Sequence, residues 1–216
     1  MLFRSVFSKK ELEGAQIMHS NWLSTSYIEN LGNGKFKISA LPSSAQLAPI
    51  YGMMPYDVDK DGLLDLLMVG NDYGMELLQG RADAFDGLVL KNMGNNQFKS
   101  IELDQSHFYI PNDARALTRI NANGKELFLA SQNKGVMKVF SLKNGESAKQ
   151  IPLSKNEVKA MVSLKNGQKR LTEFYWGSTF LSQESRSFML DAAIQEVTFY
   201  DKNNKETRSI APQNIQ

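Results

Sequence analysis

The chain has 216 residues, of which 42% are hydrophobic and 10% aromatic, and its formal net charge is +2. This composition is typical of a globular chain of one or two domains and excludes a chain that is disordered throughout. The near-neutral charge gives no sign of a nucleic-acid surface, and the absence of cysteine excludes disulfides and thiolate metal sites. The sequence contains no run of about eighteen apolar residues, so no membrane span is predicted.

The first predicted element is a short helix within residues 1–23. Ser8 and Glu11 have the spacing of a capping box, in which each side chain bonds to the backbone of the other residue. We expect a helix of about three turns to follow, with Leu12 on its covered side. His19 lies near its end without a second histidine or a nucleophile nearby in sequence, so we interpret it as a surface residue.

From Ser24 onward, short strands alternate with Asn-Gly turns. The segments 27–30 and 35–38 flank the turn 31–34 and predict a β-hairpin. The same signature returns at 90–99, which indicates an internal repeat. The separation in sequence between Ile28 and its match Leu90 is called the repeat shift below. The matching pairs are Ile28/Leu90, Asn30/Asn92, Gly32/Gly94, Asn33/Asn95, Phe36/Phe98 and Lys37/Lys99.

An acidic loop, residues 57–65, lies between these hairpins and leads directly into the apolar run 66–69. Its carboxylates surround Gly62 at alternate or near-alternate positions, which is the pattern of a short loop that wraps Ca²⁺ with oxygen ligands. An EF-hand would carry glutamate where this chain has Met68, and the apolar run predicts a buried strand instead of a helix. A polar turn without metal is the alternative. The predicted ligands are the side chains of Asp57, Asp59, Asp61 and Asp65 and the backbone carbonyl of Leu63.

The acidic loop has a predicted counterpart in the next repeat. The repeat shift places Gly124 at the position of Gly62 and Arg119 at the position of Asp57. The turn and the following strand are expected to persist while the carboxylates are lost. Because Arg119 would put a positive charge where the cation binds, we predict no calcium in the second copy.

A polar segment rich in glycine, residues 70–87, separates the two copies and is too long for a hairpin turn. Long loops often carry function, and five of its residues have suitable chemistry. One alternative is a glycoside hydrolase that uses Asp72 and Glu76 as its paired acids. The other is an ordered surface loop whose charges pair with one another. The candidate ligand-contact residues are Asp72, Tyr73, Glu76, Arg81 and Asp83.

The last third of the chain predicts a small β-module. Hairpin signals occur at 143–145 and 165–167, and a strand is expected at 195–200, followed by a turn at 201–204. Between them, aromatic and β-branched residues alternate with polar ones. Tyr175 and Trp176 can form a platform for a sugar ring, although packing in the core or at a sheet edge is the favoured interpretation.

The repeat, the Asp-x-Asp-x-Asp-Gly loop and the strand after it resemble the FG-GAP or VCBS repeat of β-propeller proteins, an architecture also seen in integrin α-chains. The stretches that carry this resemblance best are 27–36, 70–74, 80–84 and 131–135. The segment 175–186 looks like the start of the ASPIC/UnbV-type module found in large VCBS-repeat proteins of Bacteroidota. In the family, the positions matched by Asp57, Asp59, Asp61 and Asp65 bind calcium.

The resemblance implies an all-β fold, a partial β-propeller of about two to three blades. The expected parts are a helical segment (1–23), the blades (24–142) and an ASPIC/UnbV-like module (143–216). It also implies the C-terminal piece of a longer secreted or cell-surface protein, since Met1 to Phe7 are too short for a signal peptide and one is expected upstream. The missing partners are then the remaining blades or a self-association partner.

The expected function is that of a non-catalytic, calcium-stabilised module that binds a protein or a glycan. The chain has only two histidines, His19 and His107, and it has neither a Gly-x-Ser-x-Gly motif nor a phosphate-cradling loop. A carbohydrate-active enzyme or enzyme accessory that uses the loop 70–87 is one alternative, and a purely architectural module is another.

Overall fold

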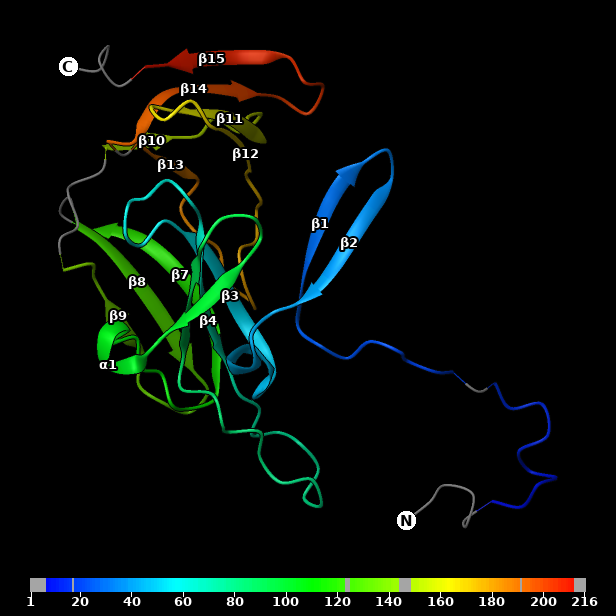
Figure 1. Cartoon of the computed structure of the whole chain (residues 1–216). Coiled ribbons are helices and arrows are strands. Elements are labelled where there is room, and N and C mark those ends of the chain that lie inside the picture. Colours follow the sequence, from blue (N-terminus) through cyan, green and yellow to red (C-terminus); the bar gives the residue numbers. More distant parts are fainter. Residues whose placement is uncertain (1–6, 17, 123–124, 144–148, 191, 212–216) are drawn as a thin grey trace.

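The computed structural model describes residues 7–16, 18–122, 125–143, 149–190 and 192–211. The fold of these residues is all-β, as predicted, and every paired strand is antiparallel to its neighbour. The strands form several small sheets rather than one large one (Figure 1). Within the described residues, no helix has the length and apolar character needed to cross a membrane.

The predicted N-terminal helix does not form in the described residues 7–16 and 18–23. The capping box forms, because the Ser8 backbone N–H donates to Glu11 at 2.8 Å and the Glu11 N–H lies 3.4 Å from the Ser8 hydroxyl. Only turns follow, and Gly14 ends them with a φ of +78°. Most of the described side chains of this segment are exposed, so no buried face repays the cost of helix nucleation.

The first part of the chain forms three sheets. The first contains β1 and β2, the second has the order β3-β4-β5-β6, and the third has the order β7-β8-β9. The short 3-10 helix η2 (Ser43–Gln46) and the single turn α1 (Leu103–Ser106) connect them. The strands are β1 (Ser26–Gly32), β2 (Lys35–Ala40), β3 (Ile50–Tyr56), β4 (Asp65–Gly70), β5 (Leu88–Asn92), β6 (Phe98–Ile101), β7 (Ala114–Ala122), β8 (Lys125–Gln132) and β9 (Lys138–Phe140).

The repeat appears in the pairing of the hairpins. Asn30 pairs with Phe36 in the hairpin β1–β2, and their counterparts under the repeat shift, Asn92 and Phe98, pair in the hairpin β5–β6. The turn is repeated as well, since Asn30 Oδ1 accepts the Gly32 N–H at 2.9 Å and Asn92 Oδ1 accepts the Gly94 N–H at 2.9 Å. The two hairpins therefore share one register and one turn geometry.

The predicted alignment of Arg119 with Asp57 is wrong. The ladder β3–β4 begins with a bulge at Ile50, opposite Gly70, and the ladder β7–β8 begins with the corresponding bulge at Ala114, opposite Gln132. The second strands therefore keep the repeat shift, whereas the first strands are displaced further along the chain. This register makes Asn121 the counterpart of Asp57. In β7–β8 the ladder continues to the pair Ala122 and Lys125, through the positions that would form the loop.

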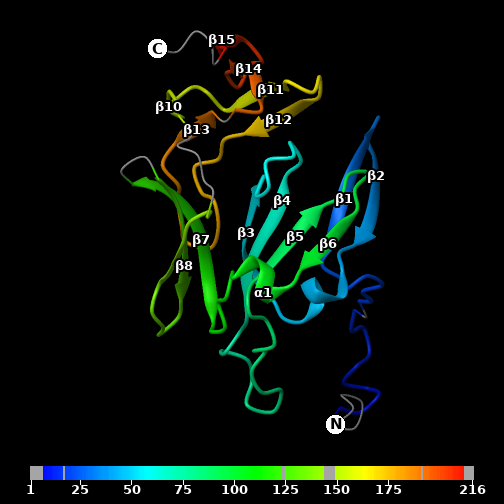
Figure 2. The same ribbon diagram turned by 60° about the vertical axis from the view of Figure 1, so that its left-hand side comes forward.

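The two faces of the sheet β3-β4-β5-β6 pack against different parts of the chain. Leu67 and Val89 face a cluster shared with β7 and β8, which includes Leu117 and Phe128. Met68 and Leu90 alternate with them along the strands and pack in a second cluster. That cluster also contains Leu41 and Ala45 from the segment before β3, with Tyr27 and Phe98 at its margin. Figure 2 shows β1 and β2 lying beside β5 and β6.

The last third of the chain has its own hydrophobic cluster, with Val162, Ile194 and Phe199 among its fully buried members. The predicted hairpin at 165–167 is confirmed as the turn between β11 and β12, and the strand predicted at 195–200 is confirmed as β14. The hairpin signal at 143–145 extends outside the described residues. The strands are β10 (Lys149–Pro152), β11 (Lys159–Leu164), β12 (Lys169–Glu173), β13 (Ser187–Leu190), β14 (Ile194–Tyr200) and β15 (Glu206–Ile210), in a sheet β12-β11-β14-β15 and a pair β10-β13.

Candidate metal centre and adjoining cavity

The acidic loop is shaped by hydrogen bonds from its own backbone to its own carboxylates. The Gly62 N–H donates to Asp57 Oδ2 at 2.9 Å, and the Leu63 N–H donates to Asp61 Oδ1 at 2.9 Å. Gly62 has a φ of +93°, a conformation that side-chain-bearing residues rarely adopt. The glycine therefore allows the sharp bend, and the bend brings alternate carboxylates to the same side.

Asp57, Asp59 and Asp61 meet in one cluster that can hold a metal ion. Each offers a carboxylate oxygen, and the three oxygens lie within 4.8 Å of one another. Oxygen ligands of Ca²⁺ stand about 2.3 to 2.6 Å from the ion, so two of them are separated by at most about 5 Å. The spacing of the three oxygens and their hard, anionic chemistry therefore fit a calcium ion.

A basic side chain also lies at this cluster. Lys91 of β5 bonds through its ammonium group to Asp59 Oδ2, and it lies 3.6 Å from Asp61 Oδ2. Partial burial acts to raise the pKa of Asp59, but the hydrogen bond and the charge of Lys91, together with backbone hydrogen bonds in the loop, outweigh burial and lower the pKa below its ordinary value. The same contact raises the pKa of Lys91. Both groups are thus held in their charged forms.

Asp65, which was predicted to close the site, lies outside that cluster. Its side chain is buried, and its two oxygens accept the backbone N–H groups of Val58 at 2.9 Å and Asn92 at 2.8 Å. Burial raises the pKa of Asp65, and the nearby charges of Asp59 and Asp61 add to the increase. Asp65 thus joins the start of the loop to β5. The carbonyl of Leu63 remains a predicted ligand.

The acidic loop also contacts the last third of the chain. Arg170 of β12 places Nη1 3.5 Å from the carbonyl oxygen of Gly62. A side chain at Gly62 would begin 3.4 Å from Asn166 and 3.5 Å from Leu164. The candidate metal loop is therefore in contact with the hairpin β11–β12.

A cavity of about 590 Å³ opens beside the loop, between β3 and the segment from β12 to β13. Small-molecule sites typically measure roughly 300 to 1,000 Å³. The segment 174–186, which forms one wall, is tied to β7 because the Thr179 hydroxyl donates to the Leu117 carbonyl at 3.0 Å. The lining combines aromatic, aliphatic and charged side chains, among them Met53, Tyr56, Asp57, Arg119, Phe174 and Tyr175.

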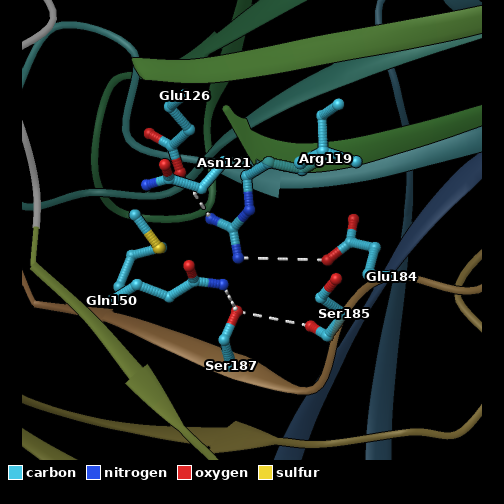
Figure 3. Close-up of a pocket in the computed structure, with 9 residues that line it drawn as sticks. Arg119, Asn121, Glu126, Gln150, Glu184, Ser185 and Ser187 are labelled. Atoms are coloured by element: carbon cyan, nitrogen blue, oxygen red, sulfur yellow. Dashed lines mark hydrogen bonds and ion pairs between the residues drawn. The ribbon is translucent and has the colours of Figure 1, made fainter. Parts of the chain in front are cut away.

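Arg119, which the sequence placed in a lost metal site, lies at the rim of this cavity. Arg119 also lines a smaller neighbouring pocket, where its guanidinium lies 3.2 Å from Glu126 Oε1 and 3.9 Å from Glu184 Oε2 (Figure 3). Burial raises the pKa of Glu184, although the charge of Arg119 opposes the shift. The Tyr56 hydroxyl donates to Glu126 and accepts a bond of 3.0 Å from the Lys60 ammonium. This chain of contacts connects the acidic loop to the cavity.

The candidate residues of the loop 70–87 are not gathered into one site. Asp72 accepts a bond of 2.8 Å from the Tyr51 hydroxyl and lies 3.1 Å from the Arg115 guanidinium. The bond from Tyr51 is the main reason that the pKa of Asp72 is lowered. Arg81 stacks over the ring of Tyr73, 4.8 Å from its centroid. Glu76 and Asp83 are both exposed.

Two buried polar residues, Asn71 within this loop and Asp113 beside it, were missed by the sequence analysis. Asp113 is fully buried and lies 2.9 Å from Arg115, which in turn lies over the ring of Tyr51. Asn71 is also fully buried, and its amide bridges Phe85 and the segment at Asn112. The repeat carries a signal for Asn71, because the repeat shift places Asn133 at the same position of the next copy.

Tyr175 and Trp176 do not pack in the core, so the part of the favoured interpretation that placed them there is wrong. Tyr175 is 69% exposed and Trp176 is 58% exposed. Arg186 stacks over the ring of Trp176, 4.0 Å from its centroid, and Tyr175 lines the cavity. Tyr175 therefore presents an exposed ring at the cavity, whereas Arg186 covers one face of the exposed Trp176 ring.

No protein-family model matches the chain, and no curated protein or solved structure matches it either.

Proposed function

We propose that the chain is a non-catalytic, calcium-stabilised module of β-propeller repeats that binds a glycan, or a protein, at the bacterial cell surface. The observation that carries the metal part is the meeting of Asp57, Asp59 and Asp61 within 4.8 Å on a loop bent at a glycine. A divalent cation offsets the repulsion among three carboxylates that the loop geometry holds together. Lys91 offsets only part of it.

Calcium in this loop stabilises the fold where the loop contacts the hairpin β11–β12 and the cavity. The loop touches the hairpin β11–β12 through Gly62 and reaches the cavity through Lys60 and Tyr56. An ion that rigidifies the loop therefore also rigidifies one wall of the cavity. In this proposal calcium is structural, and the cavity is the binding surface.

The cavity supports a glycan ligand in particular. Sugar rings stack on aromatic faces and accept or donate several hydrogen bonds. Tyr175 supplies an exposed aromatic face, and Arg119, Glu126 and Glu184 supply charged groups around the cavity. The paired acids Asp72 and Glu76 support hydrolysis less well, because Asp72 is already held by Tyr51 and Arg115.

Thermal melting with added CaCl₂ or EGTA tests the metal. We expect calcium to raise the melting temperature of the wild type and to have little effect on the variant Asp59→Asn/Asp61→Asn. Asp104→Asn is the matched control, since Asp104 is an exposed acid on α1 away from the loop. Equal melting of the wild type in both buffers would contradict the metal site.

Glycan-array binding tests the cavity separately. A glycan-binding module is supported if the wild type binds a glycan and Tyr175→Ala abolishes this binding. The melting temperature of the variant must stay that of the wild type. The control is Tyr109→Ala, since Tyr109 is an exposed tyrosine outside the cavity. A calcium-stabilised chain that retains no glycan on the array would point to the architectural alternative.

A further inference from the structure

The hairpin β1–β2 stands apart as a sheet of only two strands. Its counterpart in the next repeat, the hairpin β5–β6, belongs to a four-stranded sheet in which β5 also pairs with β4. Among the described residues, no strand pairs with the other edge of β1. Figure 1 shows this hairpin projecting from the rest of the fold, with the described N-terminal segment leading away from it.

One face of this hairpin is apolar and open to solvent. Ile28 pairs with Ile38, and Phe36 lies on the same face as Ile38, two positions away along β2. All three are exposed, and we call them the open face. The opposite face is partly covered, because the ring of Tyr27 packs 5.6 Å from that of Phe98.

The next repeat shows how these positions are covered when a partner is present. Leu90, the counterpart of Ile28, is 0% exposed, whereas Ile28 is 59% exposed. Leu90 is paired with Leu66 of β4. The segment before the hairpin follows the same rule, because Leu23 is 88% exposed and its counterpart under the repeat shift, Phe85, is 2% exposed.

Near its turn, β1 has an asparagine in the position where β5 binds an acidic residue of the neighbouring strand. In the complete sheet, the N–H of Asn92 donates to the carboxylate of Asp65, and its side-chain amide donates to the Leu64 carbonyl at 3.1 Å. Asn30 is the counterpart of Asn92 and has the same turn geometry. Its matched register presents the N–H of Asn30 on the open edge, where an aspartate at the start of a partner strand can accept it.

We propose that the open edge of β1 and the open face together form a docking surface for an antiparallel strand pair like β3–β4, contributed by a further unit of the same repeat. The inner strand of that pair is apolar on both faces and begins with an aspartate, as β4 does with Asp65. Strand addition satisfies the backbone groups of the open edge. The counterparts of Met68 and Phe85, which pack in one cluster with Leu90, then cover Ile28 on the open face. This surface is separate from the calcium loop and the cavity.

The test inserts a second copy of residues 49–87 into the full chain, directly before Ser26. This junction reproduces the natural connection, because Leu88 follows residue 87 and is the counterpart of Ser26. We expect amide hydrogen exchange across β1 to slow at least tenfold on insertion. The control insert carries Leu66→Asp and Met68→Asp in the added copy only, and we expect it to leave exchange across β1 unchanged.

A variant of the docking surface separates docking from general stabilisation. Ile28→Asp should leave the melting temperature of the uninserted chain within about 2 °C, since its side chain is exposed. The same substitution should remove the protection that the insert provides. Equal exchange across β1 with the native and control inserts would overturn the proposal. The proposal would also be overturned if the uninserted chain formed a dimer and Ile28→Asp abolished that dimer. A second copy of the chain would then be the occupant.

Discussion

The ammonium group of Lys91 bonds to Asp59 and lies 3.6 Å from Asp61, so a lysine from β5 neutralises part of the candidate metal site. The lysine and a divalent cation compete for the same carboxylates. Any metal that binds must displace this contact or share the two oxygens with it.

Removal of that charge should therefore strengthen metal binding. We expect Lys91→Met to bind Ca²⁺ about tenfold more tightly than the wild type, as measured by isothermal titration calorimetry. Lys99→Met is the matched control, since Lys99 pairs with Lys91 across the strands and is exposed. Unchanged affinity in Lys91→Met would show that the lysine does not oppose the cation.

Asp65 should stabilise the loop even without metal. Asp65→Ala leaves the N–H groups of Val58 and Asn92 without their carboxylate partner, which costs about 2 to 4 kcal/mol in the free energy of unfolding. Urea denaturation in EGTA measures this cost with metal absent. Asp65→Asn retains one acceptor oxygen and should cost less. If Asp65→Ala had the same denaturation midpoint as the wild type in EGTA, Asp65 would act only as a metal ligand.

Asn71 and Asn133 are counterparts with different environments. The buried amide of Asn71 bonds to Phe85 through both its oxygen and its nitrogen, whereas Asn133 is exposed and bonds through its side chain to Asp113. We expect Asn71→Ala to lower the free energy of unfolding by about 2 to 4 kcal/mol and Asn133→Ala by about 1 kcal/mol or less. Similar losses in the two variants would contradict this assignment.

Gly70 should not tolerate a side chain. A Cβ atom there would lie 2.1 Å from the carbonyl oxygen of Pro49, which accepts the N–H of Asn71 at 3.0 Å. Gly70→Ala must therefore displace the backbone at the start of β3, and we expect a loss of about 3 kcal/mol or more. Gly177→Ala, with its nearest atom at 3.9 Å, should change stability by about 0.5 kcal/mol or less.

Glu157 and Arg208 should make the last third of the chain sensitive to acid. Burial acts to raise the pKa of Glu157, but the Ser154 N–H and the Arg208 guanidinium outweigh it and lower the pKa below its ordinary 4.5. A lowered pKa in the folded state means that the ionised group stabilises the fold above about pH 4.5, and that this contribution is lost as the pH falls through the folded value.

The variant Glu157→Gln tests this dependence. It cannot ionise, so we expect its stability relative to the wild type to be lowest near pH 7 and the difference to shrink between about pH 5 and 3. Chemical denaturation across this range measures the difference. A difference that stays constant with pH would show that the charge of Glu157 contributes nothing, leaving only its hydrogen bonds.

Local patterns were sufficient where one segment makes its own contacts. The hairpin turns at Gly32 and Gly94, the strand that became β14 and the bend at Gly62 depend on neighbours in sequence, so their spacing predicted them. The cluster of Asp57, Asp59 and Asp61 follows from the same principle, because one short loop contains all three carboxylates.

Contacts between distant segments decided the rest. Asp65 looked like a fourth ligand until β5 placed the N–H of Asn92 against it, and Arg119 looked like part of a lost metal site until the register of the ladder β7–β8 placed it at the cavity. The N-terminal helix had its capping box but no surface to pack on. The sequence alone determined turns and alternation, because these are local. Register, burial and the partners of each charge required the tertiary structure, because they depend on groups many residues away.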